Sequence, residues 1–290
     1  MSRFARFAAI DWSGAKGTRH RGIAVAVCQA GEDAPRLVQP GHVWSRTEVL
    51  DWVLETRDEA PTLYGFDLSG AFAFADCGAY FPQWERSPAD VRGLWRLVEE
   101  LSASEPDLGA SAFHDHPEAS RHFRRHGARC GDLFTPGAGR MRVVELEEKR
   151  QGLCNPVSNF NLVGAAQVGK SSLTGMRLFL RLDGLVPIWP FDPRPERGSA
   201  VVEIYTSIAA ADAGLPRGRT KVREAAGLDR ALARLASRPH APLARYDDHA
   251  TDALISAAWL RLFAEDEGLW SPASLTPEIA RTEGWTFGVR

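Results

Sequence analysis

The sequence has few cysteines and no long apolar run, and both absences narrow the class of protein. Its four cysteines are far apart and form no C-x-x-C pair, which argues against thiolate zinc sites and a disulfide framework. No run approaches the roughly 20 apolar residues of a membrane helix, and the apolar stretch near the start is too short and too soon interrupted for a secretory signal. We therefore expect a protein of the reducing cytoplasm without a membrane segment.

A strong charge of one sign is also missing. The chain has 35 Lys and Arg against 37 Asp and Glu, a formal net charge of −2. This balance does not supply the field of a protein that coats nucleic acid, although it leaves room for a local basic groove. With 290 residues, 44% of them apolar and 25% charged, the chain is long enough for one large globular domain.

Two short stretches of the chain repeat each other. Residues 7–14 read F-A-A-I-D-W-S-G and residues 63–70 read L-Y-G-F-D-L-S-G, so each apolar run ends in an aspartate followed by x-Ser-Gly. Burying a carboxylate without compensation costs free energy, so Asp11 and Asp67 at the ends of two predicted strands indicate a functional site. A strand-end aspartate can also form a turn or cap a helix, and this alternative stays open for each residue alone.

The remaining pattern predicts an order of strands and helices. Short β-rich runs over 4–11, 22–28 and 37–44 predict three successive strands. A capping-box pattern at Ser45 and Glu48 then begins a helix, and 62–67 forms a fourth strand that can lie parallel to an earlier one. Further along, we expect helices over 89–101, 114–126, 172–182, 221–236 and 247–263, a short strand over 160–163 and a convincing strand over 200–205.

This order is that of an α/β protein with a ribonuclease H-like fold. We expect a single domain over residues 1–290, with a mixed five-stranded sheet flanked by helices and an insertion over about residues 76–199 between the fourth and fifth strands. In such a sheet the first and fourth strands are parallel neighbours. Asp11 and Asp67 would then emerge side by side at the carboxyl ends of these strands.

Acidic residues also begin the last long predicted helix. Asp248 and Asp252 are four positions apart and share one helical face. Converging carboxylates repel one another unless divalent cations neutralise them, and hard oxygen ligands suit Mg²⁺ or Mn²⁺. Two such ions about 4 Å apart can activate water and stabilise the leaving oxygen of a phosphodiester, and His249 could carry a proton. Asp247 and Asp248 could instead cap the helix, and Asp252 could face solvent.

Four motifs carry a resemblance to a known family. A-I-D-W-S-G, Y-G-F-D-L-S-G, V-E-I-Y-T-S and D-D-H-A-T-D-A-L resemble an uncharacterised family of predicted nucleases with a ribonuclease H-like, RuvC-like fold. The resemblance implies a nuclease that hydrolyses DNA or RNA with Mg²⁺ or Mn²⁺. It implies Asp11 and Asp67 as metal ligands from the sheet, Asp252 as the ligand from the helix, and Asp248 in support. Glu203 matches a glutamate of the family; as a mid-strand residue it either faces solvent or enters the site.

A competing motif lies in the middle of the chain. Residues 164–171, G-A-A-Q-V-G-K-S, match the phosphate-loop pattern, in which Lys170 would contact phosphates and Ser171 would contact Mg²⁺. The preceding stretch alternates polar and apolar residues, unlike the nearly all-apolar strand that feeds such a loop, and no suitable downstream aspartate completes the site. We interpret the segment as a turn into a helix, with Lys170 near a phosphate of a nucleic-acid substrate. An NTPase that uses Gly164 to Ser171, and a non-catalytic protein that binds nucleic acid or a nucleotide, remain the alternatives.

Overall fold

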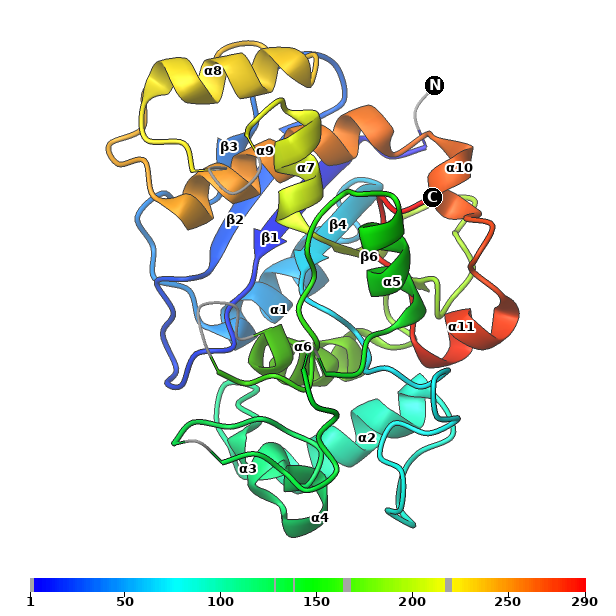
Figure 1. The fold of residues 1–290 in the computed structure, drawn as a ribbon. Helices are drawn as coiled ribbons and strands as arrows, with labels where there is room; N and C mark the ends of the chain where they lie inside the picture. The colour runs from blue at the N-terminus through cyan, green and yellow to red at the C-terminus, as the bar shows by residue number, and fades with distance from the viewer. Residues whose placement is uncertain (1–2, 128, 138, 164–167, 217–220) are drawn as a thin grey trace.

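A mixed sheet of six strands forms the centre of the protein (Figure 1). The computed structural model describes residues 3–127, 129–137, 139–163, 168–216 and 221–290. The strand order is β3-β2-β1-β4-β6-β5, in which β1, β2 and β3 pair antiparallel and β1, β4, β6 and β5 pair parallel. The strands are β1 (Arg6–Asp11), β2 (Ala24–Gln29), β3 (Arg36–Leu37), β4 (Thr62–Asp67), β5 (Ile188–Trp189) and β6 (Ala200–Ile204).

Helices cover both faces of this sheet, which explains why its central strands are almost uniformly apolar. Successive residues of a strand point to opposite faces: Ala8 and Ile10 belong to one hydrophobic core, and Phe7 and Ala9 belong to the other. The helices are α1 (Arg46–Thr56), α2 (Val91–Ser102), α3 (Ser111–Asp115), α4 (Pro117–Ser120), α5 (Val143–Arg150), α6 (Val168–Leu182), α7 (Thr206–Asp212), α8 (Ala225–Arg234), α9 (Asp248–Phe263), α10 (Glu267–Trp270) and α11 (Pro277–Thr282).

Two long helices, α9 and α6, lie on opposite faces of the sheet. The helix α9 packs across β1 and β2 and is itself covered by α7 and α8. Because it is enclosed in this way, α9 is apolar around most of its circumference. On the other face α6 packs against α1 and α2, and Phe179 of α6 contacts the rings of Phe66 on β4 and Trp95 on α2.

The predicted pairing of the first and fourth strands is confirmed, whereas the expected number of strands is wrong. Residues 188–189 add a sixth, two-residue strand beside β6. The expected strand over 37–44 contributes only Arg36–Leu37, and residues 160–163 make a single bridge between Asn161 and Arg124 and do not join the sheet.

Two predicted helices also differ from those observed. Residues 114–126 do not form one helix: α3 ends at Asp115, and His116 is extended because Pro117 follows it. The helix expected over 221–236 is shorter, with α8 covering Ala225–Arg234. In the parts of the chain that the structure describes, no helix has both the length and the apolarity needed to cross a bilayer.

Candidate active site

Asp11 and Asp67 lie opposite each other on adjacent parallel strands. The register pairs the two residues directly, at the carboxyl ends of β1 and β4. Neighbouring strands are about 4.8 Å apart, so the two aspartates share one edge of the sheet. Asp11 is 7% exposed.

The hydrogen bonds to the two buried carboxylates are long. Asp11 Oδ2 lies 3.3 Å from His249 Nδ1, and Asp67 accepts from the backbone N–H and the hydroxyl of Thr206, each at 3.3 Å. Burial raises the pKa of Asp11 and outweighs the opposing effect of His249. Burial and then the charge of Asp11 raise the pKa of Asp67 well above its usual range. In both residues the effect of burial exceeds that of the hydrogen-bond partners.

The carboxylate of Asp252 interacts electrostatically with those of Asp11 and Asp67. It lies in the second turn of α9, and burial followed by repulsion from Asp11 and Asp248 raises its pKa to about 7. Among the described residues, no hydrogen bond or ion pair compensates its carboxylate. The charge of Asp252 in turn raises the pKa of Asp67. The sheet and α9 therefore place the three residues that the sequence predicts as metal ligands within range of one another's charge.

The other two aspartates of α9 have different roles. The side chain of Asp247 caps the helix by accepting from the backbone N–H of Ala250 at 2.9 Å. Asp248 forms ion pairs with Lys221 and Arg223. Although burial opposes it, these two cations hold the pKa of Asp248 below its usual value. Asp248 is thus neutralised by protein side chains, whereas Asp252 is not.

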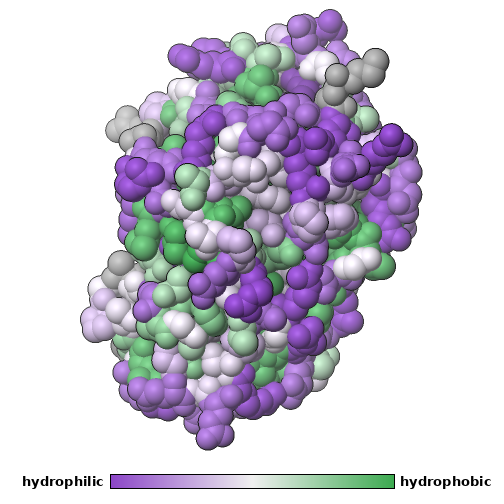
Figure 2. Space-filling view, turned by 90° about the vertical axis from the view of Figure 1, so that its right-hand side faces the viewer, coloured by the Kyte–Doolittle hydropathy of each residue, from purple (hydrophilic) through white to green (hydrophobic). Residues whose placement is uncertain are grey.

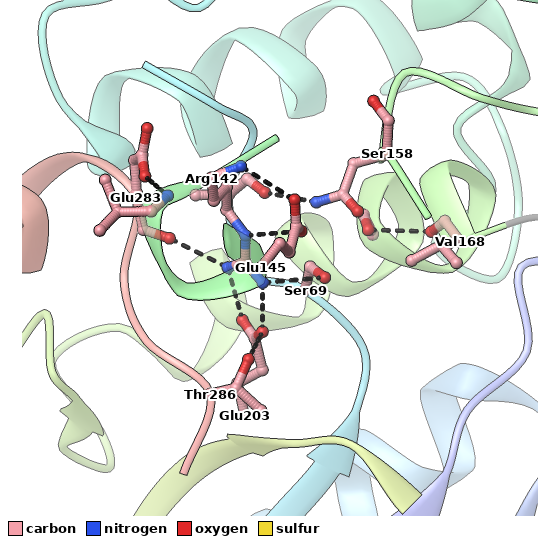
Figure 3. Close-up of polar contacts among 12 residues, drawn as sticks. Ser69, Arg142, Glu145, Ser158, Val168, Glu203, Glu283 and Thr286 are labelled. Carbon is pink, nitrogen blue, oxygen red and sulfur yellow. Dashed lines mark hydrogen bonds and ion pairs between the residues drawn. The ribbon is translucent and has the colours of Figure 1, made fainter. Parts of the chain in front are cut away.

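Glu203 is buried and forms an ion pair with Arg142 (Figure 3). Its carboxylate accepts from Arg142 Nη1 at 2.9 Å and Nη2 at 2.5 Å, from the Gly70 N–H at 2.9 Å and from the Thr286 hydroxyl at 2.8 Å. These four contacts use the acceptor capacity of the carboxylate. Glu203 therefore enters the interior rather than facing solvent, and it acts by holding the backbone that follows Asp67.

Arg142, for which no role was predicted from the sequence, forms the centre of this hydrogen-bond network. Besides Glu203, its guanidinium donates to Glu145 Oε1 at 3.0 Å, to the Glu283 carbonyl at 3.0 Å and to Ser69 Oγ at 3.2 Å. These contacts engage all five donors that an arginine has. Arg142 thus ties together β6, the loop after β4, α5 and the C-terminal segment. No local pattern marks it, because its partners lie far along the chain.

Both copies of the repeated motif pack closely against α6. A Cβ atom on Gly14 would lie 2.3 Å from the backbone of Lys170, and a Cβ atom on Gly70 would lie 2.9 Å from the ring of Phe179. The variable residues of the motif also contact this helix: Trp12 Nε1 donates to Thr174 Oγ1 at 3.0 Å, and the side chain of Leu68 packs against Gly175. The glycines are needed for close packing, and the motif orients both aspartates by anchoring the loops that follow them.

Only part of the predicted phosphate loop can be placed. Residues 164–167 lie outside the described residues, and Val168 to Ser171 form the first turn of α6. The Ser171 hydroxyl donates to the Val168 carbonyl at 2.8 Å. Lys170 lies in the wall of a cavity that also contains Asp67.

This cavity has a volume of about 360 Å³ and extends between α5 and α6 at the ends of β4 and β6. Its apolar wall includes Trp12, Leu68, Val157 and Tyr205, and its polar wall includes Lys170, Arg142 and Glu148.

On the face shown in Figure 2, polar residues surround small groups of apolar ones.

Comparisons of the chain with protein-family models, curated proteins and solved structures found no match.

Proposed function

We propose that this protein is a divalent-metal-dependent nuclease with a ribonuclease H-like fold, which hydrolyses phosphodiester bonds in nucleic acid. Asp11, Asp67 and Asp252 would bind Mg²⁺ or Mn²⁺. The observation that carries the proposal is the direct pairing of Asp11 with Asp67 at one edge of the sheet, where burial disfavours the charged form of both residues and the charge of Asp11 adds to this effect at Asp67.

The sheet topology supports the proposed fold. Three antiparallel strands lead through α1 into β4, which pairs parallel with β1, and β6 then continues the parallel half of the sheet. The helix that carries Asp252 packs across β1 and β2. The shared edge of the sheet and the start of this helix are where the resemblance places the ligands.

The donor set suits a hard divalent cation. All three candidate ligands are carboxylates, and a cation would offset the repulsion among them. In the described part of the chain, no group of three or more His, Cys, Asp or Glu side chains is placed so that it could hold a metal ion as it stands. Binding of one ion by all three carboxylates would therefore require their side chains to move closer together. Mg²⁺ also keeps several waters and takes up substrate phosphates. When bound, such an ion would polarise the phosphodiester and activate water.

His249 supplies a proton-carrying group beside the carboxylates. Its side chain is 46% exposed, and the hydrogen bond to Asp11 raises the pKa of its imidazole. A protonated imidazole can donate its proton to a leaving oxygen. Lys170, in the wall of the adjacent cavity, would attract the phosphates of the substrate strand.

A titration with Mn²⁺ combined with a cleavage assay tests the proposal. Calorimetry should detect Mn²⁺ binding to the wild-type protein, and labelled single-stranded and duplex DNA and RNA should be cleaved only with Mg²⁺ or Mn²⁺. Asp67→Asn should remove both properties and retain the circular dichroism spectrum. The matched control is Asp51→Asn, on the exposed face of α1, which should change neither. Absence of Mn²⁺ binding at millimolar concentration would refute the proposal.

The position of Lys170 favours one alternative, a protein that binds nucleic acid or a nucleotide without cleaving it. The same cavity and the same basic residue would serve that function. Binding of oligonucleotides that persists in Asp67→Asn, with no cleavage by the wild type under any metal condition, would favour this alternative.

A further inference from the structure

The cavity beside Asp67 has the size of a site for one small ligand. Its volume of about 360 Å³ lies near the lower end of the roughly 300–1,000 Å³ typical of such sites. Because Asp67 lies in its wall, an occupant of the cavity would adjoin the proposed metal centre. A single unstacked nucleotide is the part of a nucleic-acid substrate that fits these dimensions.

The walls of the cavity have the chemistry of a nucleobase site. Trp12 and Tyr205 add aromatic surface, and Leu68 and Val157 add aliphatic surface. Unstacked bases bind proteins through contacts of this kind together with hydrogen bonds to the base edge. The carboxyl groups of Glu145, Glu148 and Glu203 also line the cavity and can accept hydrogen bonds.

Apart from Asp67, which is assigned to the proposed metal site, Glu148 is the carboxyl group among the described lining residues that receives no hydrogen bond from Arg142. Glu145 and Glu203 accept hydrogen bonds from Arg142, whose five donors are all engaged. Glu148 is 2% exposed. Within the described chain, its carboxylate has one hydrogen-bond donor, the thiol of Cys154 at 3.3 Å. Burial, followed by the charge of Glu145, raises the pKa of Glu148 to about 7, as expected for an acid without a cationic partner.

We propose that this cavity holds an unstacked guanine of the substrate strand and that Glu148 recognises it. The inference rests on the proposed nuclease function. A carboxylate accepts two hydrogen bonds side by side, and guanine presents adjacent N1–H and N2–H₂ donors. Adenine, cytosine and uracil each present acceptors next to their donors. Glu148 would therefore make the enzyme prefer bonds next to a guanine.

Binding of nucleosides and mononucleotides to the full chain tests this inference separately from cleavage. Guanosine and guanosine 5′-monophosphate, with the adenine, cytosine and uracil counterparts, are titrated by calorimetry at pH 8 with chelator present. We expect the guanine ligands to bind at least tenfold more tightly than the others. Glu148→Gln should remove this preference and weaken guanosine binding at least tenfold. The matched control is Glu147→Gln, because Glu147 pairs with Arg150 instead of lining the cavity.

A second variant covers the case in which Glu148→Gln fails to fold. Val157→Trp places a large side chain in the cavity wall and should abolish guanosine binding while Mn²⁺ binding is retained. Equal affinity for all four bases, or unchanged guanosine binding in both variants, would overturn the inference even if metal-dependent cleavage is found. Guanosine binding that depends on Glu148 without any cleavage would support the pocket and contradict the nuclease proposal.

Discussion

Replacing Glu203 with glutamine separates a structural role for this residue from a role in metal binding. The substitution keeps the shape of the side chain but removes the charge that faces Arg142 and turns an amide N–H₂ toward one of the existing donors. Breaking a buried ion pair by removing one partner costs about 3–5 kcal/mol. Glu145 still compensates the guanidinium, so we expect a loss near the lower value, about 3 kcal/mol.

This loss converts into a measurable change in melting temperature. Unfolding entropy of about 2 cal/mol/K per residue amounts to about 0.6 kcal/mol/K for the 290-residue chain. Glu203→Gln should therefore lower the melting temperature by about 5 °C in scanning calorimetry, while the affinity for Mn²⁺ stays within about threefold of wild type.

A double-mutant cycle is the control for this reasoning. Arg142→Met leaves both Glu145 and Glu203 buried without their cation, so it should be more damaging than Glu203→Gln. The double variant should lose less stability than the sum of the two single variants, because residues in direct contact couple by about 0.5–3 kcal/mol. Additive losses, or an unchanged melting temperature with lost Mn²⁺ affinity in Glu203→Gln, would refute the structural role.

Three further predictions follow from other contacts. Gly14→Ala should destabilise the protein in urea denaturation, because its Cβ would overlap the backbone of α6, whereas Gly227→Ala in α8 meets no contact closer than 3.5 Å and should be neutral or slightly stabilising. Burial raises the pKa of Glu148 from its ordinary value of 4.5 to about 7 in the folded protein. The protonated form of Glu148 therefore stabilises the folded state below about pH 4.5, and this stabilisation is lost as the pH rises through 7. Glu148→Gln should remove this loss, up to about 3 kcal/mol between pH 4.5 and 8.5 in urea denaturation; equal pH dependence of both proteins would contradict it. Asp248→Asn should keep Mn²⁺ affinity within about threefold, since Asp248 is already neutralised by two cations; loss of Mn²⁺ binding would show that it is a ligand.

The strand ends at Asp11 and Asp67 were predictable because the required information is local, whereas the pairing of the two strands followed from the expected order of strands in the fold. An apolar run that ends in an aspartate predicts both a strand and its end, and the helix between the two strands predicts that they run parallel. The start of α9 was predictable for the same reason, since an acidic cap precedes a long apolar helix. The two-residue strand β5 was missed because so short a segment has no periodicity to detect.

The roles of individual acids depend on contacts between distant segments and could not be predicted. Asp248 and Asp252 share a helical face in the sequence pattern, and only the arrival of Lys221 and Arg223 distinguishes them. Glu203 stayed ambiguous because its partner Arg142 lies 61 positions earlier in the chain. The adjacent cavity was not predicted either, since its walls come from segments that the fold brings together from most of the chain.

Anomalous diffraction from crystals soaked in millimolar Mn²⁺ tests the central claim most directly. The proposal predicts an anomalous peak between the carboxylates of Asp11 and Asp67, which the register places opposite each other, with Asp252 close to it. The same soak of Asp67→Asn should lose this peak. No peak at this edge of the sheet in the wild-type protein, or a peak only at the acidic residues of α5, would contradict the account.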